Sequence, residues 1–290
     1  MNKFTKIAAL IMALVLCLSF AACGGKEEPE TTASVEETTV DVIAPVEDET
    51  TAEATEAETT VEETTVEETT VEETTEAAST MPEGKEAIVE YFNTAVNKVK
   101  TDAKSVEQKH VTNYLANSPT LPSAIGGIYK MLGEDKWLDG MLVDNSQGSA
   151  TYTGADIDAK FPVEGESWAS KLTASDVKSA DIKEADGVYT ITIVTKADAK
   201  SDSVKHGEGH NAKAFNVVLP GVVNDNIPGI AASMVGLSTM GYPMGKVVVK
   251  VDAETGNVKS ADYDIQWTIN FDKIGAAIPL GTKSSYVVTF

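Results

Sequence analysis

A repetitive acidic segment confines the folded part of this chain to its last 209 residues. The pentapeptide Val-Glu-Glu-Thr-Thr occurs at residues 35–39 and three times in tandem at 61–75. Residues 24–80 contain nineteen acidic residues, one lysine and no aromatic residue, and so carry −18 of the chain's net charge of −22. So little hydrophobic surface with so much like charge cannot offset the entropy lost on ordering. We therefore expect a disordered, low-complexity linker at 23–81 and one domain at 82–290.

The first 22 residues combine a basic start with an apolar run. Lys3 and Lys6 precede residues 7–20, in which Ser19 is the one polar side chain. A basic region followed by an apolar region and small residues is typical of a secretory signal peptide. The run is shorter than the about 20 apolar residues that a permanent spanning helix needs. We therefore expect residues 1–22 to direct export and then to be removed.

The end of the apolar run holds a cysteine in a distinctive setting. Ala21 and Ala22 precede Cys23, and two glycines follow it. This stretch resembles the lipobox of bacterial lipoproteins, with Phe20 where leucine is usual. The resemblance implies cleavage after Ala22 and a diacylglyceryl group on the Cys23 sulfur, and two acyl chains such as palmitate anchor a protein stably to the extracytoplasmic face of the cell membrane. Cys17 is a poorer site because a bulky leucine precedes it. The alternative is an ordinary secretory signal with an incidental cysteine.

The domain opens with a helical pattern. Thr80 and Glu83 have the spacing of a capping box, and Pro82 is tolerated in a first turn. Apolar residues then recur at intervals of three and four, which predicts a helix over 82–106. The stripe consists of Ile88, Phe92, Ala95, Val96, Val99, Ala103 and Val106. A second, short helix is expected at 124–132. Since no cysteine follows Cys23, packing alone must hold the domain.

Beyond residue 148 the apolar period becomes two, which is typical of β-strands. Asp186-Gly187 lies between 177–184 and 188–196 and predicts a tight hairpin. Residues 246–252 and 258–271 predict a second hairpin. In its second arm, alternate residues form one apolar face: Ala261, Tyr263, Ile265, Trp267, Ile269 and Phe271. Further strands are expected at 150–153, 159–163, 215–219 and 284–290, whereas 111–116 fits either a short strand or an extension of the helix.

These patterns predict an α+β fold, in which a long N-terminal helix packs on a curved antiparallel sheet built from consecutive hairpins. The arrangement is similar to several extracytoplasmic lipoprotein-carrier and cystatin-like folds, and the C-terminal domain resembles uncharacterised extracytoplasmic lipoprotein domains. The resemblance concerns architecture, and a shared fold does not imply a shared function.

One short motif contains potential metal ligands. His206, Glu208 and His210 alternate with two glycines, and zinc often uses imidazole and carboxylate ligands. A metal-dependent or histidine-assisted hydrolase is therefore the alternative to a binding protein. The glycines and the preceding polar residues favour a solvated, mobile loop instead, and the spacing differs from the helical His-Glu-x-x-His pattern. We assign no catalytic residue, metal or cofactor from this motif.

Residues 220–245 form an unusual apolar segment, with five glycines and two internal prolines. Flexible apolar side chains can line an adaptable ligand pocket. The pocket candidates are Ile230, Met234, Leu237, Met240 and Met244. The simpler interpretation is that the segment caps the open end of the sheet.

The predicted lipid anchor and the lack of a recognisable catalytic motif favour a non-enzymatic lipoprotein on the cell surface. Its domain would bind an apolar ligand, a cell-wall component or a protein partner, while lipidated Cys23 binds the membrane. Nucleic acid is excluded as a partner, because phosphate contacts need clustered Lys and Arg and the domain is mildly acidic. A purely structural wall protein is a third hypothesis.

Overall fold

The computed structural model describes residues 81–123, 147–225 and 235–290, together with residues 126, 130, 136, 227, 232 and 233. The expected signal peptide, the lipidation site Cys23, the acidic linker and most of the second helix expected at 124–132 lie outside the described residues. So do two of the pocket candidates, Ile230 and Met234.

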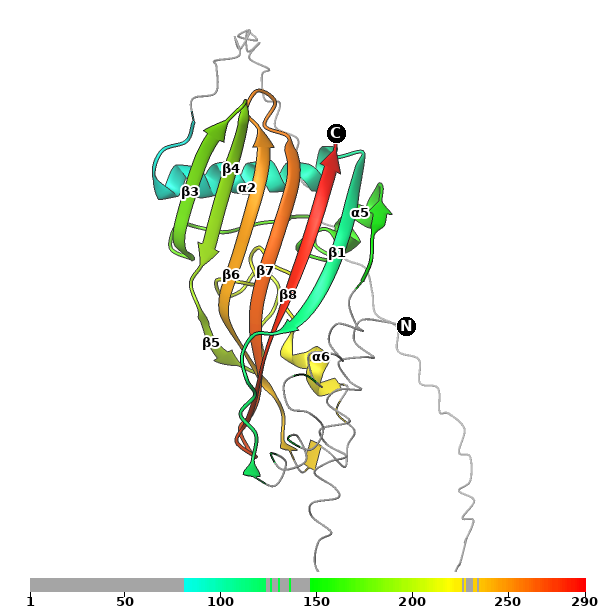
Figure 1. Ribbon diagram of the computed structural model, residues 1–290, viewed down its shortest axis with the longest axis vertical. Helices are drawn as coiled ribbons and strands as arrows, with labels where there is room; N and C mark the ends of the chain where they lie inside the picture. Colours follow the sequence, from blue (N-terminus) through cyan, green and yellow to red (C-terminus); the bar gives the residue numbers. More distant parts are fainter. Residues whose placement is uncertain are drawn as a thin grey trace, which may run out of the picture. The chain divides into compact units, whose positions relative to one another are not determined.

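An eight-stranded antiparallel sheet dominates the described domain (Figure 1). Its strands follow the order β2-β1-β8-β7-β6-β4-β3, and β5 pairs with β6 beside this path. The strands are β1 Ser105–Leu115, β2 Ala150–Tyr152, β3 Val177–Ala185, β4 Val188–Thr195, β5 Asp198–Ser201, β6 Thr239–Asp252, β7 Val258–Phe271 and β8 Ala276–Thr289. The α+β class expected from the sequence therefore holds, with the sheet as the larger component.

Three hairpins build most of the sheet. In the β3–β4 turn, Asp186 and Gly187 have φ values of 53° and 71°. Two positive φ values in a two-residue loop are typical of a type I′ turn, so this hairpin prediction is confirmed. The β6–β7 hairpin is also confirmed, and β7–β8 forms the third. The first and last strands are neighbours, since Ser105 of β1 pairs with Thr289 of β8.

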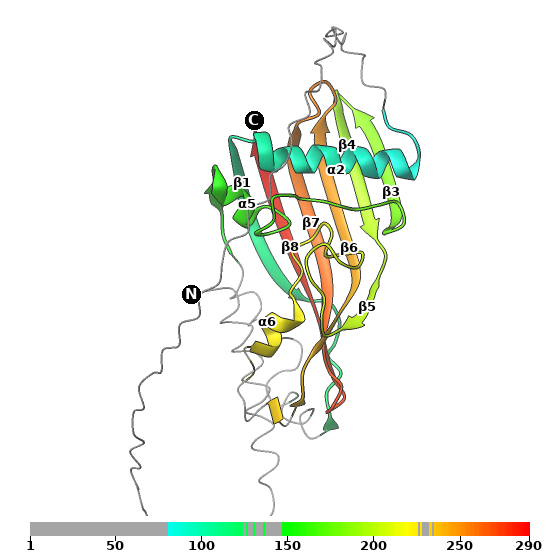
Figure 2. The same cartoon turned by 180° about the vertical axis from the view of Figure 1, so that it is seen from behind.

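The long helix is α2, Gly84–Asp102, which is shorter than the expected 82–106. Glu83 precedes it without a side-chain cap, so the expected capping box is wrong. Val106, assigned above to the apolar stripe of the helix, lies in β1, where the backbone pairs with β8. Figure 2 shows α2 crossing one face of the sheet, and its buried residues are Ile88, Val89, Phe92, Ala95, Val96 and Val99.

Two other strand predictions are wrong. Residues 159–163 contain the end of the short helix α5, Ala155–Lys160, followed by a turn. Residues 215–219 form an irregular segment, in which the Phe215 N–H donates to the carbonyl oxygen of Asn211. Phe215 is fully buried without belonging to a strand. An apolar run therefore indicated burial correctly and backbone conformation incorrectly, because both a loop and a strand can bury such side chains.

The core lies on the face of the sheet that α2 covers. On β7 the six alternate apolar residues predicted to share a face are all buried, whereas the residues between them are partly or fully exposed. Near the middle of this face, the Tyr263 ring makes edge contacts with the rings of Phe161, Phe215 and Tyr286 at centroid distances of 5.7–6.3 Å. Figure 2 shows loops and the short helix α6, Pro220–Asp225, on the same side of the sheet.

Candidate functional site

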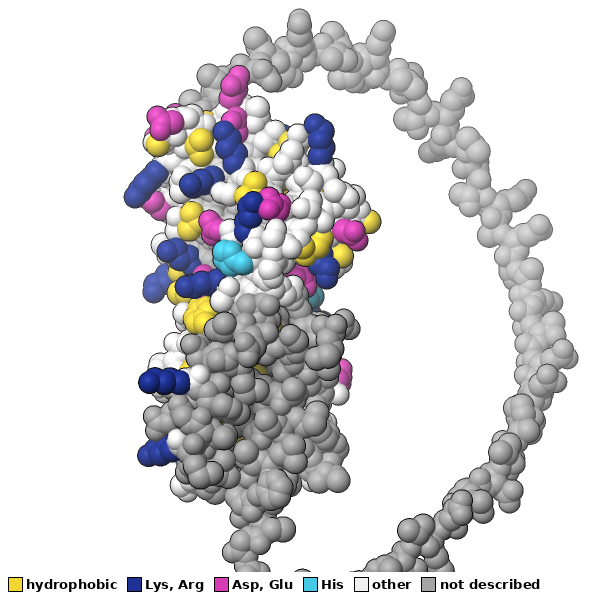
Figure 3. All heavy atoms as spheres, turned by 45° about the vertical axis from the view of Figure 1, so that its right-hand side comes forward, with side chains coloured by type: hydrophobic (Ala, Val, Ile, Leu, Met, Phe, Trp, Pro, Cys, Tyr) yellow, Lys and Arg dark blue, Asp and Glu magenta, His cyan; other side chains and the backbone are white. Residues whose placement is uncertain are grey.

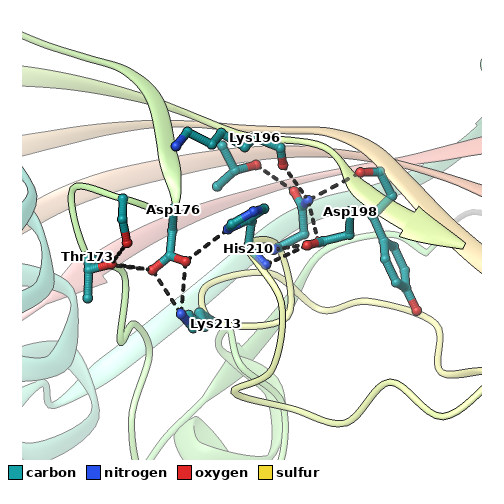
Figure 4. Close-up of polar contacts among 10 residues, drawn as sticks. Thr173, Asp176, Lys196, Asp198, His210 and Lys213 are labelled. Carbon is teal, nitrogen blue, oxygen red and sulfur yellow. Dashed lines mark hydrogen bonds and ion pairs between the residues drawn. The ribbon is translucent and has the colours of Figure 1, made fainter. Parts of the chain in front are cut away.

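The loop of residues 205–213, expected to be mobile, is tied to the sheet by hydrogen bonds (Figure 4). Asn211 is fully buried, and its amide nitrogen donates to the carbonyl oxygen of Lys196 at 2.9 Å and to the Asp198 carboxylate at 2.8 Å. Its amide oxygen accepts a hydrogen bond from the Thr195 hydroxyl at 2.5 Å. Since Thr195 ends β4 and Asp198 begins β5, Asn211 fastens the loop to both strands.

The backbone geometry of this loop requires glycine at position 209, although the glycines of the motif had suggested flexibility. Gly209 has a φ of +63°, and a Cβ there would lie 2.7 Å from Oδ1 of Asp198. The Asp198 carboxylate accepts the backbone N–H groups of His210 at 2.6 Å and Asn211 at 2.9 Å. The loop therefore needs a residue without a side chain where its backbone wraps around this carboxylate.

Asp176 forms the second anchor of the same loop (Figure 4). Its side chain is only 4 % exposed and accepts hydrogen bonds from Lys213 Nζ at 2.8 and 2.9 Å, from His210 Nδ1 at 2.9 Å and from the Thr173 hydroxyl at 2.7 Å. Burial raises the pKa of this carboxyl, but the hydrogen bonds from Lys213, His210 and Thr173 outweigh burial and hold the pKa well below its ordinary value.

The three residues of the metal alternative are not brought together. Glu208 accepts the backbone N–H of Lys205 at 3.1 Å, and His210 faces Asp176. His206 Nδ1 is buried and has no hydrogen-bond partner in the part of the chain that the structure describes. Within the described ranges, no three His, Cys, Asp or Glu side chains are arranged to hold a metal ion. The motif thus contributes a loop anchor rather than a ligand set.

The Asp176–His210 pair also lacks the remaining parts of a hydrolytic site. A carboxylate that orients an imidazole is one half of a nucleophile–base arrangement, and the other half is a hydroxyl or thiol within hydrogen-bond reach of the imidazole. Among the described residues, no hydroxyl or thiol is hydrogen-bonded to His210. Lys213 and Thr173 instead donate further hydrogen bonds to the buried Asp176 carboxylate.

The described pocket candidates occupy three different environments. Met240 is fully buried on the inner face of β6, opposite Ile269. Met244 lies opposite Gln266 and is half-buried. Leu237 is 68 % exposed. A register shift between 241 and 244 separates the two methionines. Since Ile230 and Met234 are not described, the remaining three candidates do not define one pocket wall.

The described residues of 218–238, called here the cap segment, contact the hydrophobic core and the turn after β7. Its described apolar residues Val223, Ile227 and Val235 belong to the hydrophobic core. Asn224 clasps the segment, since its amide oxygen accepts hydrogen bonds from the Ser238 N–H at 2.7 Å and the Ser238 hydroxyl at 2.9 Å.

Two further contacts tie the cap segment to the sheet and to the turn after β7. The Tyr242 hydroxyl of β6 donates to the carbonyl oxygen of Val218 at 2.7 Å, and Lys273 donates to the carbonyl oxygen of Ser233. No sequence signal identified Asn224 and Ser238 as the clasp, because their fourteen-residue separation has no local pattern.

One buried core residue, Trp267, has a side-chain donor that lacks a hydrogen-bond partner among the described residues. Trp267 is 97 % buried on the inner face of β7, opposite Leu280 of β8. Its indole Nε1 has no hydrogen-bond partner among the described residues. Buried tryptophans usually find an acceptor, and an unsatisfied buried donor costs about 1–3 kcal/mol. The sequence placed Trp267 on the buried face correctly but held no indication that its N–H would lack a partner.

Comparison with protein-family models, with curated proteins and with solved structures found no match for this chain. Among the helices of the described residues, none is long and apolar enough to cross a membrane.

Proposed function

We propose that this chain is a lipid-anchored extracytoplasmic lipoprotein whose domain binds an apolar ligand without catalysing a reaction. Residues 1–22 are the signal peptide, Cys23 carries the diacylglyceryl group and residues 24–81 are the spacer. The basic start, the short apolar run and the two alanines before Cys23 support the anchor. Two acyl chains on one residue are sufficient for stable membrane binding.

The ligand-binding proposal rests on the cap segment. Most of the inner face is covered by α2 and by loops that buried polar anchors such as Asn211 and Asp176 hold to the sheet. In the cap segment, the described residues include the short helix α6 and the hydrogen-bonded pair of Asn224 and Ser238. An apolar surface covered by such a segment is a common setting for a small-molecule site.

The exposed surface offers less to a wall component or a protein partner. Among the described residues, the exposed large hydrophobic side chains are Met81, Leu237 and Val287. These three residues are far apart in the sequence. Figure 3 shows one side of the domain, where apolar side chains are interspersed with Lys, Asp and Glu. Docking surfaces usually contain a contiguous apolar centre. The interior beneath the cap segment is therefore the better site.

Titration of residues 24–290 with the fluorescent apolar probe N-phenyl-1-naphthylamine tests this proposal. We expect saturable binding with increased probe emission. The variant Ser238→Ala removes one hydrogen bond of the clasp and should speed probe dissociation. Ser170→Ala is a matched control, since Ser170 is equally buried and bonds to Asn93 of α2, away from the cap segment. Non-saturable probe emission, or equal dissociation rates for both variants and the parent, would overturn the proposal.

A further inference from the structure

We infer that the ligand is a neutral amphiphile, such as an acyl chain with an ester or amide carbonyl, and that this carbonyl accepts a hydrogen bond from Nε1 of Trp267. The inference rests on the proposed function and specifies its ligand class. An indole N–H is a donor only, so the group that satisfies it must be an acceptor.

The surroundings of Trp267 define the rest of the ligand. On β7 its neighbours on the same face are Ile265 and Ile269, and its cross-strand partner on β8 is Leu280. Leu280 in turn pairs with Leu115 of β1. Along β7 and across β8 and β1 the neighbours of this donor are aliphatic, and on β6 the nearby Tyr242 hydroxyl already donates to Val218, which matches a ligand that is mostly hydrocarbon and carries one hydrogen-bond acceptor.

The charge of the acceptor follows from the same surroundings. Transfer of a carboxylate into an apolar site costs far more free energy than one hydrogen bond returns, whereas one hydrogen bond more than offsets the cost for an ester or amide carbonyl. The described residues next to Trp267 on its own face and on β8 are uncharged. Neutral acyl esters and amides are therefore favoured over free fatty acids.

Tyr263 provides a useful contrast on the same strand. Its hydroxyl is also buried and, within the described ranges, has no hydrogen-bond partner. However, the rings of Phe161, Phe215 and Tyr286 enclose it, and it lies about 13 Å from Trp267 at the usual rise per strand residue. The Tyr263 hydroxyl thus belongs to the aromatic core, whereas Trp267 lies four residues further along β7, towards the end that is followed by the turn from which Lys273 contacts the cap segment.

Competition against bound N-phenyl-1-naphthylamine on residues 24–290 tests the inference. The competitors are methyl decanoate, tridecane of similar length without an acceptor, and decanoate. We expect methyl decanoate to bind about five- to tenfold more tightly than tridecane, the difference that one hydrogen bond makes. Trp267→Phe should remove this preference while the probe still binds. Trp168→Phe is the matched control and should keep it, because the Trp168 indole already donates to Glu166 at 2.9 Å.

A measurement on the unmodified protein complements the variants. Methyl decanoate should move the Trp267 indole N–H resonance downfield in an NMR titration, and tridecane should not. If the probe binds but ester and alkane compete equally, or if decanoate competes best, the inference is wrong and the proposed function stands. If the probe does not bind saturably, both are wrong.

Discussion

The ring of Tyr114 on β1 lies directly against Gly281, its register partner on β8. A Cβ at position 281 would lie 2.2 Å from Cζ of the tyrosine. The Tyr114 hydroxyl donates to Oδ1 of Asp264 at 2.6 Å, and Nζ of Lys283 lies 5.1 Å from the ring centroid. The tyrosine therefore covers the strand surface that the glycine leaves open, on the polar face of the sheet.

Gly281→Ala should destabilise the domain because the new methyl group displaces the Tyr114 ring. Overpacking of this kind costs about 1–3 kcal/mol. Urea denaturation followed by circular dichroism measures the change in the free energy of unfolding. At Gly148 a Cβ would meet nothing within 4 Å, so Gly148→Ala should be neutral or stabilising by about 0.4–1 kcal/mol. Equal midpoints for Gly281→Ala and the parent would show that Tyr114 is not seated on the glycine.

Asn211→Asp should be among the most destabilising isosteric changes in the domain. The amide nitrogen that donates to Asp198 and to the carbonyl oxygens of Lys196 and Tyr242 becomes a carboxylate oxygen, so three donor–acceptor contacts become repulsive. A buried charge without a compensating partner costs about 3–5 kcal/mol. Thermal unfolding at neutral pH measures the effect. Asn117→Asp is the control, since Asn117 is exposed and its side-chain oxygen remains an acceptor for the Ser118 N–H.

Asp176 should make the domain sensitive to acid. Hydrogen bonds from Lys213, His210 and Thr173 hold the pKa of this carboxyl below its ordinary value in the folded state. A lowered folded-state pKa contributes stability above the unfolded-state pKa of about 3.9, and this contribution is lost as the pH falls towards the folded-state pKa.

The measurement for Asp176 is the free energy of unfolding of the parent and of Asp176→Asn between pH 7 and pH 2. The variant should be less stable by about 1.5–3 kcal/mol at pH 7, because charge-assisted hydrogen bonds are lost. The difference should shrink below about pH 4. A constant difference across the range would show that the ionised form of Asp176 is not what stabilises the loop.

Cys23→Ala should leave the precursor unlipidated. In the proposed anchor the diacylglyceryl group is attached to the Cys23 sulfur, which alanine lacks. Mass spectrometry of the membrane fraction detects the diacylglyceryl group and the new N-terminus. Cys17→Ala is the control and should be processed normally. Lipid found on the Cys23→Ala variant would assign the anchor to Cys17 instead.

The fold was predictable wherever a local pattern determines the backbone. Asp186 and Gly187 accept positive φ values, which determined the β3–β4 turn. The alternation from Ala261 to Phe271 predicted both the strand and its buried face, because successive strand residues point to opposite faces. Non-local pairings were not predictable. The pairing of β1 with β8 joins the two ends of the domain, and it moved Val106 from the expected helix into a strand.

The residues of the candidate site were harder to predict from the sequence than the strands. His206, Glu208 and His210 looked like ligands because they are close in the sequence, yet the spatial partner of His210 is Asp176, 34 residues away. Asn211, Asn224 and Ser238 had no signal at all, because a buried amide or hydroxyl is identified only by the groups that surround it.

The sequence by itself predicted the division of the chain and determined the buried faces of α2 and β7, since hydrophobicity, charge and turn chemistry act over a few neighbouring residues. It also located the buried side of β7 that carries Trp267. Only the tertiary structure decided which polar groups meet. Asp176 gains two side-chain partners, His210 and Lys213, from a distant loop and a third from nearby Thr173, whereas Trp267 Nε1 gains none among the described residues. Hydrogen bonds need specific distances and directions, which the packing of the whole domain creates.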